Sequence, residues 1–216
     1  ADAGIIGFLR SIESVSDIIP RPEPNSTCEL HFWPLGELCR REPDLLLELN
    51  IAGRLYHVVI EAKYMSGPSD GDDAEITHQG ESFTIGNQLG DQFRDLVNGE
   101  YVVYRGSSRI QMMRLASRVE DRLLLYLTAH LFRPQEELDR GLEYCPDARG
   151  RLFWANWHRV YDYLGDAGEE LRQFPYSRIV RDLCTLLDQK QFSSFHGIAE
   201  LPDVKMEGVS GSFWRD

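Results

Sequence analysis

Two β-rich runs joined by a short glycine-containing connection constrain the fold of this 216-residue chain most strongly. The first run, EPDLLLELN, covers residues 42–50, and the second, LYHVVIEAKY, covers residues 55–64. The connection between them, IAGR, is short enough for a tight turn. The pattern therefore predicts an antiparallel β-hairpin over residues 44–64.

The register of this hairpin brings two carboxylates together. If residues 52–53 form the turn, Asp44 lies opposite Glu61. Directly opposed side chains in an antiparallel pair have Cβ atoms roughly 4.5–5.5 Å apart, and like charges there are destabilising. A divalent cation is the simplest compensation. Strand alternation places Lys63 on the same face as Glu61, so an Asp, a Glu and a Lys converge on one patch.

These residue types are the ones that metal-dependent phosphodiester hydrolysis needs. The carboxylates of Asp44 and Glu61 can hold Mg²⁺ or Mn²⁺ through hard oxygen ligands, and the carbonyl of Ala62 could supply another. Lys63 can orient or deprotonate the attacking water and can stabilise charge that develops in the transition state.

The same residues resemble a known signature. Glu42-Pro43-Asp44 at the start of one apolar strand, and Ile60-Glu61-Ala62-Lys63 at the end of the next, resemble the motif of the PD-(D/E)xK, or restriction-endonuclease-like, nuclease superfamily, and the C-terminal pattern resembles that of bacterial members. The resemblance implies that Asp44 and Glu61 are metal ligands and that Lys63 is the catalytic lysine. It covers residues 4–132.

The resemblance also implies two supporting positions. Members of the superfamily often carry a metal-binding Glu on the first helix, which matches Glu13 here, with Glu37 as the alternative. Many also carry a Gln on the helix that crosses over between strands, which matches Gln88. Gln92 lies one turn further along the same helix face.

We expect an α/β fold with a restriction-endonuclease-like core, a central mixed sheet flanked by helices, followed by a C-terminal helical extension. The core covers residues 1–135, and the extension, residues 136–216, packs on it within the same domain. The elements expected are helix 4–19, strand 28–34, the hairpin, a polar surface loop at 65–85, helix 86–98, helix 106–122, strand 122–132, and helices 153–165 and 176–192.

Other clusters have ordinary interpretations. The acidic residues at 70–75 lack the order of an EF-hand, and a solvated loop explains them better than calcium. Five arginines between 105 and 122 could share a helix face that meets a nucleic-acid backbone or could pair with acidic neighbours. The four cysteines have no zinc-site spacing and are expected as reduced, buried or half-buried thiols. The four tryptophans are expected to pack in the core or close the C-terminal helices rather than stack on bases.

The charge balance limits how nucleic acid can be bound. The chain has 23 Lys and Arg against 35 Asp and Glu, a formal charge of −12, so it has no long-range field that attracts a polyanion. Any contact with DNA must be local, metal-assisted or supplied by a partner. No apolar run approaches the roughly 18 residues of a membrane span, and the N-terminal ten residues do not resemble a signal peptide. We expect a cytoplasmic protein that makes no membrane contact.

The sequence thus favours a Mg²⁺- or Mn²⁺-dependent nuclease that acts on DNA rather than RNA, with Asp44, Glu61 and Lys63 in the site and Glu13 and Gln88 in support. Because the chain starts without Met and is strongly acidic, we expect a component of a larger bacterial restriction, mobile-element or anti-phage assembly, with a protein partner or a second copy. The alternative is a non-catalytic scaffolding subunit with the same fold. A third hypothesis is a hydrolase of another phosphoester or nucleotide.

Overall fold

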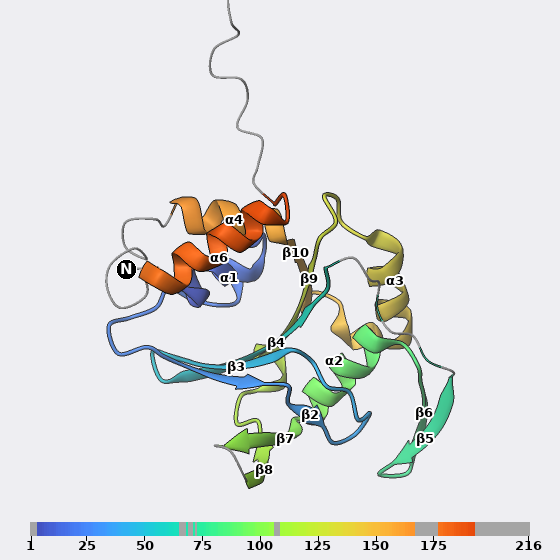
Figure 1. The fold of residues 1–216 in the computed structure, drawn as a ribbon. Coiled ribbons are helices and arrows are strands. Elements are labelled where there is room, and N and C mark those ends of the chain that lie inside the picture. The colour runs from blue at the N-terminus through green and yellow to red at the C-terminus, as the bar shows by residue number, and fades with distance from the viewer. Residues whose placement is uncertain are drawn as a thin grey trace, which may run out of the picture.

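A five-stranded mixed sheet forms the centre of the computed structural model, in the order β1-β3-β4-β9-β10 (Figure 1). The structure describes residues 4–64, 68, 71, 73–105, 109–166 and 177–192. Strands β1, β3 and β4 pair antiparallel, whereas β9 runs parallel to both β4 and β10. The predicted α/β class with a mixed central sheet is therefore confirmed. The five strands are β1 Thr27–Phe32, β3 Leu45–Ile51, β4 Arg54–Ala62, β9 Arg122–Thr128 and β10 Leu152–Asn156.

Helices cover both faces of this sheet (Figure 1). On one face lie α1 (Ile5–Ser11) and α4 (Trp157–Asp166), with α6 (Ser177–Gln189) beyond α4. On the other lie α2 (Gln88–Asn98) and α3 (Gln135–Tyr144). Each face has its own apolar core because alternate strand residues point to opposite sides. No helix among the described residues combines the length and the apolar character that crossing a bilayer requires.

The β3–β4 hairpin has the predicted register. Ile51 pairs with Arg54, and the ladder continues to Leu45 opposite Ile60. Ala52 and Gly53 form the turn with φ of 53° and 77°. Two consecutive positive φ angles are the mark of a type I′ turn, whose twist matches that of the strands it joins. This turn fixes which residues of the two strands face each other.

The first predicted helix is too long. Helix α1 ends at Ser11, and a short 3-10 helix, η1 (Val15–Asp17), follows after an extended residue. The Ser11 hydroxyl donates to the Phe8 carbonyl at 2.7 Å, and Ser14 has a φ of 65°, so the chain leaves the helix between these serines. The periodicity nevertheless identified residues that are buried, because the segment after the helix packs on the same face of the sheet.

The segment predicted as a polar loop at 65–85 contains a hairpin in its described part. Strands β5 (Ala74–His78) and β6 (Glu81–Ile85) pair through a turn at Gln79-Gly80, which also has two positive φ angles. The hairpin lies outside the central sheet, and its strands are mostly exposed. Its short polar strands bury too little surface to give a clear hydrophobic alternation. Residues 65–67, 69–70 and 72 lie outside the described residues.

The helix predicted at 106–122 is wrong in the described part. Strand β8 (Arg109–Arg114) forms a hairpin with β7 (Glu100–Arg105), and β7 also pairs with the short β2 (Leu35–Gly36). A 3-10 helix, η2 (Val119–Asp121), then leads into β9. The sequence RIQMMR fits strand and helix periods equally well, and pairing with β7 selects the strand.

The arginines of this segment therefore do not share a helix face. Arg114 pairs with Glu100 at 2.8 Å, and Arg118 lies 3.9 Å from Glu120. Arg122 is buried and donates to four backbone carbonyls, among them Val97 at 2.6 Å. Pairing with acidic neighbours, the alternative, is therefore found for Arg114 and Arg118. Arg122 instead links the end of α2 to the segment before β9 through its hydrogen bonds.

The C-terminal third also differs from the predicted helices. Residues 152–156 form β10, so the predicted helix at 153–165 begins instead with α4 at Trp157. After residue 135, α3 and η3 (Pro146–Ala148) are followed by β10, which lies in the central sheet. This part of the chain is therefore not a purely helical extension. The predicted helix at 176–192 corresponds to α6. The strand predicted at 122–132 corresponds to β9, which ends earlier, at Thr128, and whose seven residues are all buried.

Candidate active site at the end of strand β4

The carboxylate of Glu61 is the buried centre of the candidate site. Glu61 lies one residue before the end of β4 and is 3% exposed. Gln88 Nε2 donates to its Oε1, and Gln92 Nε2 donates to its Oε2, both at 2.7 Å. Lys63 Nζ lies 2.7 Å from Oε1. Strand alternation aims Glu61 and Lys63 at the face that α2 covers.

Helix α2 is positioned to deliver its two glutamines. Asn87 caps the helix by accepting a hydrogen bond from the Gly90 amide at 2.9 Å. Gln88 and Gln92 follow at a spacing of four, so they share the helix face that meets the sheet. The structure therefore brings Gln88 and Gln92, as well as Lys63, to the predicted partner Glu61.

Asp44 approaches the same strand end from the neighbouring strand. It directly precedes β3, and its Oδ2 accepts a hydrogen bond from the Ala62 amide at 2.7 Å. Its own carbonyl accepts from the Trp33 amide at 3.1 Å. Asp44 thus contacts the residue that follows Glu61.

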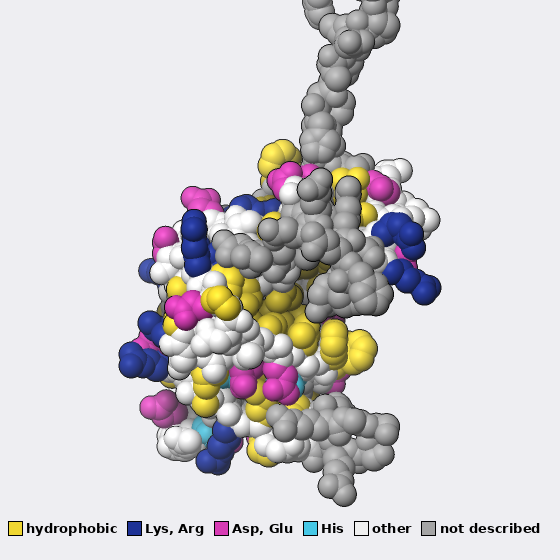
Figure 2. All heavy atoms as spheres, turned by 90° about the vertical axis from the view of Figure 1, so that its left-hand side faces the viewer, with side chains coloured by type: hydrophobic (Ala, Val, Ile, Leu, Met, Phe, Trp, Pro, Cys, Tyr) yellow, Lys and Arg dark blue, Asp and Glu magenta, His cyan; other side chains and the backbone are white. Residues whose placement is uncertain are grey.

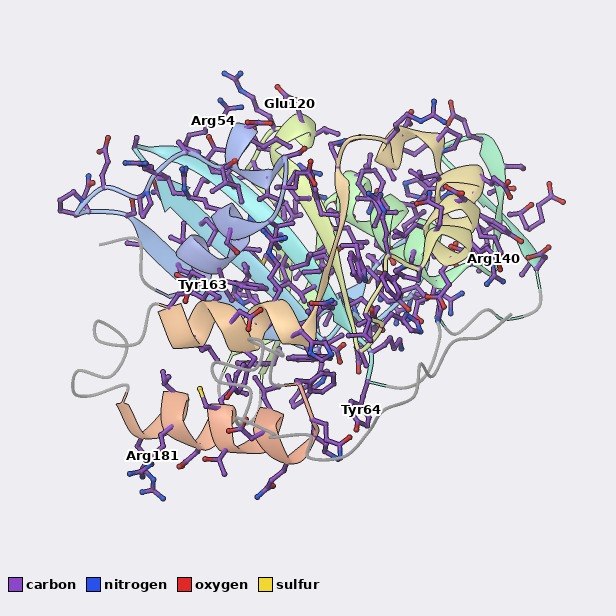
Figure 3. The ribbon with its side chains drawn as sticks, turned by 90° about the horizontal axis from the view of Figure 1, so that it is seen from above. Arg54, Tyr64, Glu120, Arg140, Tyr163 and Arg181 are labelled. Atoms are coloured by element: carbon purple, nitrogen blue, oxygen red, sulfur yellow. The ribbon has the colours of Figure 1, made fainter. Side chains whose placement is uncertain are left out.

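The backbone of Lys63 is held on two sides. Its amide donates to the Leu127 carbonyl at 2.7 Å, which continues the pairing of β4 with β9. Its carbonyl accepts from Trp157 Nε1 at 3.1 Å, which ties it to α4. The residue after it, Tyr64, lies at the opposite end of the sheet from Arg54, where β4 begins (Figure 3). The candidate site occupies this Tyr64 end of β4.

Groups of the chain itself offset the repulsion between Asp44 and Glu61. This corrects the argument from sequence that a divalent cation is needed to offset it. Lys63 and the amides of two glutamines contact Glu61, and a backbone amide contacts Asp44. Charge repulsion alone consequently does not require a metal here. Among the described residues, no group of three or more His, Cys, Asp and Glu side chains is arranged to hold a metal ion.

The donor set nevertheless fits a hard divalent cation. Mg²⁺ is commonly held by one or two carboxylates and keeps several waters, so Asp44 and Glu61 with one carbonyl would suffice. Gln92 adds an independent sign, because its Oε1 is buried and has no hydrogen-bond partner among the residues that the structure describes. Buried amide oxygens without a partner are rare, and an ordered water, such as one bound to a metal, would satisfy this atom.

Neither Glu13, the predicted acidic auxiliary, nor its alternative Glu37 has a described contact with Asp44 or Glu61. Glu13 is exposed in the turn after α1 and lines a hollow of about 1020 Å³ together with residues of β10 and α4. No hydrogen bond or ion pair among the described residues joins Glu13 to Asp44 or Glu61. Glu37 pairs with Arg40 at 3.0 Å on the surface.

Two acidic residues of α2 position the segment that leads to Asp44, and sequence reasoning missed them. Asp95 Oδ1 accepts from the amides of Leu38 and Cys39 at 2.9 and 2.7 Å. Asp91 receives two hydrogen bonds from the Arg41 guanidinium, at 3.1 and 2.7 Å. The signal available in the sequence was the spacing of four between these two residues, which places both on one face of the helix.

Asp95 is unusual because it is almost fully buried. Burial raises its pKa to about 6, and the negative charge of Asp91 adds to that rise. The three backbone amides that it accepts from act in the opposite direction, since they favour the ionised form. Asp95 therefore acts as a structural acceptor that holds the 38–41 loop against α2.

Comparison of the chain with models of protein families, with curated proteins and with solved structures gave no match.

Proposed function

We propose that this chain is a divalent-metal-dependent nuclease that hydrolyses phosphodiester bonds in DNA. The observation that carries the proposal is the contact of Glu61 with Lys63 and two glutamines, beside the Ala62 amide that binds Asp44. The order α1, β1, β3–β4, α2, β9, with β4 and β9 parallel, agrees with the αβββαβ order expected for a restriction-endonuclease-like core and so supports the assignment.

Each residue has a separate role in the proposed reaction. Asp44, Glu61 and the carbonyl of Ala62 would hold Mg²⁺ or Mn²⁺, and such an ion would supply an acidified water and positive charge opposite the phosphate. Lys63 orients the attacking water and stabilises the charge that develops at phosphorus. Gln88 and Gln92 fix the Glu61 carboxylate. As water adds to phosphorus it gives up a proton to solvent, the bond to the leaving oxygen breaks, and that oxygen takes up a proton from solvent. A role for Glu13 as a further ligand stays a prediction.

The proposal includes a partner that delivers the DNA. The chain carries a formal charge of −12, and in the segment 105–122 Arg114 and Arg118 lie beside acidic groups while Arg122 is directed inward. A second subunit, a further domain or a second copy of this chain would supply the phosphate contacts that this charge disfavours.

Cleavage of supercoiled plasmid and of single-stranded DNA tests the proposal, with Mn²⁺, Mg²⁺ or EDTA. We expect metal-dependent cutting that falls by at least about 100-fold in Lys63→Ala. Arg181→Ala, which removes an exposed cation on the outer side of α6, should cut like the wild type (Figure 3). Cutting that survives EDTA, or that Lys63→Ala leaves unchanged, would contradict the proposal.

One observation favours the scaffolding alternative. Both oxygens of Glu61 already accept hydrogen bonds from the chain, so the carboxylate has partners without a metal. For a scaffold, the purified chain would cut no DNA and its stability would not respond to Mn²⁺.

A further inference from the structure

Strand β1 is an open edge of the central sheet, and apolar side chains are exposed along it. It is the first strand in the order of the sheet, and among the described residues it pairs with β3 alone. Leu30 is 46% exposed and Phe32 is 58% exposed. Trp33, which follows the strand, is 59% exposed, so the expectation that it packs in the core is wrong. An exposed apolar edge strand is a template for pairing with another strand.

The pairing of β1 with β3 determines which backbone groups point to the open edge. The Trp33 amide donates to the carbonyl of Asp44 at 3.1 Å, and these two residues continue the register of the two strands. Hydrogen-bonded and non-hydrogen-bonded pairs alternate along an antiparallel ladder. The odd-numbered residues of β1 therefore bond to β3. The amides and carbonyls that point to the open edge belong to the even-numbered residues Cys28, Leu30 and Phe32.

A second copy of β1, related by a two-fold axis, can pair with this edge. With the axis at Leu30, that residue faces its own counterpart, and Cys28 faces Phe32 of the second copy. The outward backbone groups of the two copies then meet as hydrogen-bonded pairs of an antiparallel ladder. The apolar side chains of these residues lie together on one face of the joined strands.

The charged residues of β1 select this register over its neighbours. Glu29 and His31 lie on the face opposite to the apolar side chains. An axis at Glu29 would set two glutamates directly opposite each other, which is destabilising, and an axis at His31 would oppose two histidines. Of these three registers, only the axis at Leu30 places Glu29 of each copy opposite His31 of the other. The strand is thus complementary to itself in charge as well as in hydrogen bonding.

Among the described residues, His31 Nε2 has no hydrogen-bond partner, although the residue is only 6% exposed. Glu29 Oε1 of the same strand lies 3.8 Å away, which is beyond hydrogen-bond distance. Buried polar atoms without a partner are rare. In the joined strands, Glu29 of the second copy would lie directly across from His31, in the type of antiparallel pair whose side chains approach most closely.

We propose that β1 is the interface of a symmetric homodimer, in which the central sheets of two copies join edge to edge about an axis at Leu30. The interface is isologous, because each copy contributes the same six-residue strand. The inference does not depend on the proposed nuclease function, because the strand that carries Glu61 lies two positions away from β1 in the sheet.

Sedimentation of the full chain over a series of protein concentrations tests the interface. Leu30→Lys sets two like charges opposite each other at the axis, and lysine on an edge strand opposes edge pairing. Ile179→Lys is the matched control, because Ile179 is 68% exposed but lies on α6. We expect the wild type and Ile179→Lys to dimerise alike, and Leu30→Lys to raise the Kd of the dimer at least about tenfold. Circular dichroism checks that both variants fold.

Cross-linking tests the register. The Cα atoms of a hydrogen-bonded antiparallel pair are about 5.5 Å apart, within the range that a disulfide spans. Thiols introduced by Leu30→Cys should therefore join the two copies under a mild oxidant. Thiols introduced by Thr27→Cys lie on the same exposed strand but would be roughly 20 Å apart across the axis. We expect a covalent dimer from Leu30→Cys, and no more than a trace from Thr27→Cys or from the wild type.

A wild type that stays monomeric at every concentration would overturn the inference. This is also the result expected if β1 pairs with a strand of a different protein. A dimer that Leu30→Lys leaves intact would show that the two copies meet through another surface. Equal cross-linking of Leu30→Cys and Thr27→Cys would likewise reject the proposed axis, because the two strands would then not be paired in this register.

Discussion

Glu61 shows what a single buried carboxylate requires from its surroundings. An ionised group removed from water is costly unless hydrogen bonds and opposite charge replace the lost hydration. Here Lys63 and two glutamines meet that need, and they come from the same strand and from one helix face. The carboxylate is therefore held in one orientation before any ligand arrives, and a preorganised group of this kind costs no rearrangement during a reaction.

Asp95 yields a prediction about pH. Its pKa is about 6 in the folded protein, above its ordinary value of 3.8, because the carboxyl is buried. Between these values the folded state retains a proton that the unfolded chain has lost, so the contribution of Asp95 to stability falls as pH rises and levels off above about pH 7. Relative to Asp95→Asn, the wild type should lose about 2 kcal/mol of unfolding free energy from pH 4 to pH 7.

Urea denaturation of both proteins at several pH values measures this difference. Taking the difference removes the contributions of the other titrating groups, including His57, whose pKa burial lowers. A difference that stays constant with pH, or that grows in favour of the wild type as pH rises, would show that the pKa of Asp95 is not raised in the folded protein.

At the scale of elements, the close approach of β2 to α2 leads to a second stability prediction. A Cβ at Gly36 would overlap the carboxylate of Asp95, which is fixed by the amides of the following loop. We expect Gly36→Ala to lower the free energy of unfolding by about 1–3 kcal/mol. Denaturation by urea is the measurement.

Gly165→Ala is the matched control for that substitution. Gly165 lies in α4, and a Cβ there would meet nothing within 4 Å. Alanine is favoured over glycine inside a helix, so this change should leave stability unchanged or raise it by up to about 1 kcal/mol. Equal effects of the two substitutions would mean that β2 does not pack on Asp95 as described.

Elements whose sequence pattern fits only one kind of secondary structure were predictable from sequence. The I′ turn at Ala52-Gly53 sets the β3–β4 register, and the continuous apolar run of β9 has the character of a strand covered on both faces. Segments whose pattern fits both a helix and a strand were not predictable. RIQMMR and the start of the 153–165 segment fit a helix, and pairing with β7 and β9 decided them.

The candidate site was predictable to the same extent. Register and strand alternation place Asp44, Glu61 and Lys63 together, while Gln88 came from the resemblance to a nuclease superfamily. The support by Asp91 and Asp95 depends on a loop whose path no local pattern specifies. The exposure of Trp33 depends on one left-handed residue before a proline, which sequence preferences disfavour.

The whole molecule has a formal charge of −12, whereas the proposed substrate is a polyanion. On the face drawn in Figure 2, hydrophobic side chains gather across the middle, and Lys and Arg lie apart around the rim rather than in one patch. A formal charge of −12 opposes the approach of DNA, and a bound cation would reduce that charge at the site itself. The proposed metal ion would therefore serve both the reaction and the approach of the substrate.

The effect of Mn²⁺ on the stability of the wild type and of Asp44→Asn tests the proposed metal centre most directly. Asparagine keeps an oxygen that can accept the Ala62 amide, so the variant loses the charge and retains the fold. At a Mn²⁺ concentration 100 times the Kd, we expect the unfolding free energy of the wild type to rise by about 2.7 kcal/mol and that of the variant to stay unchanged. No stabilisation of either protein, or equal stabilisation of both, would contradict a metal centre at Asp44 and Glu61.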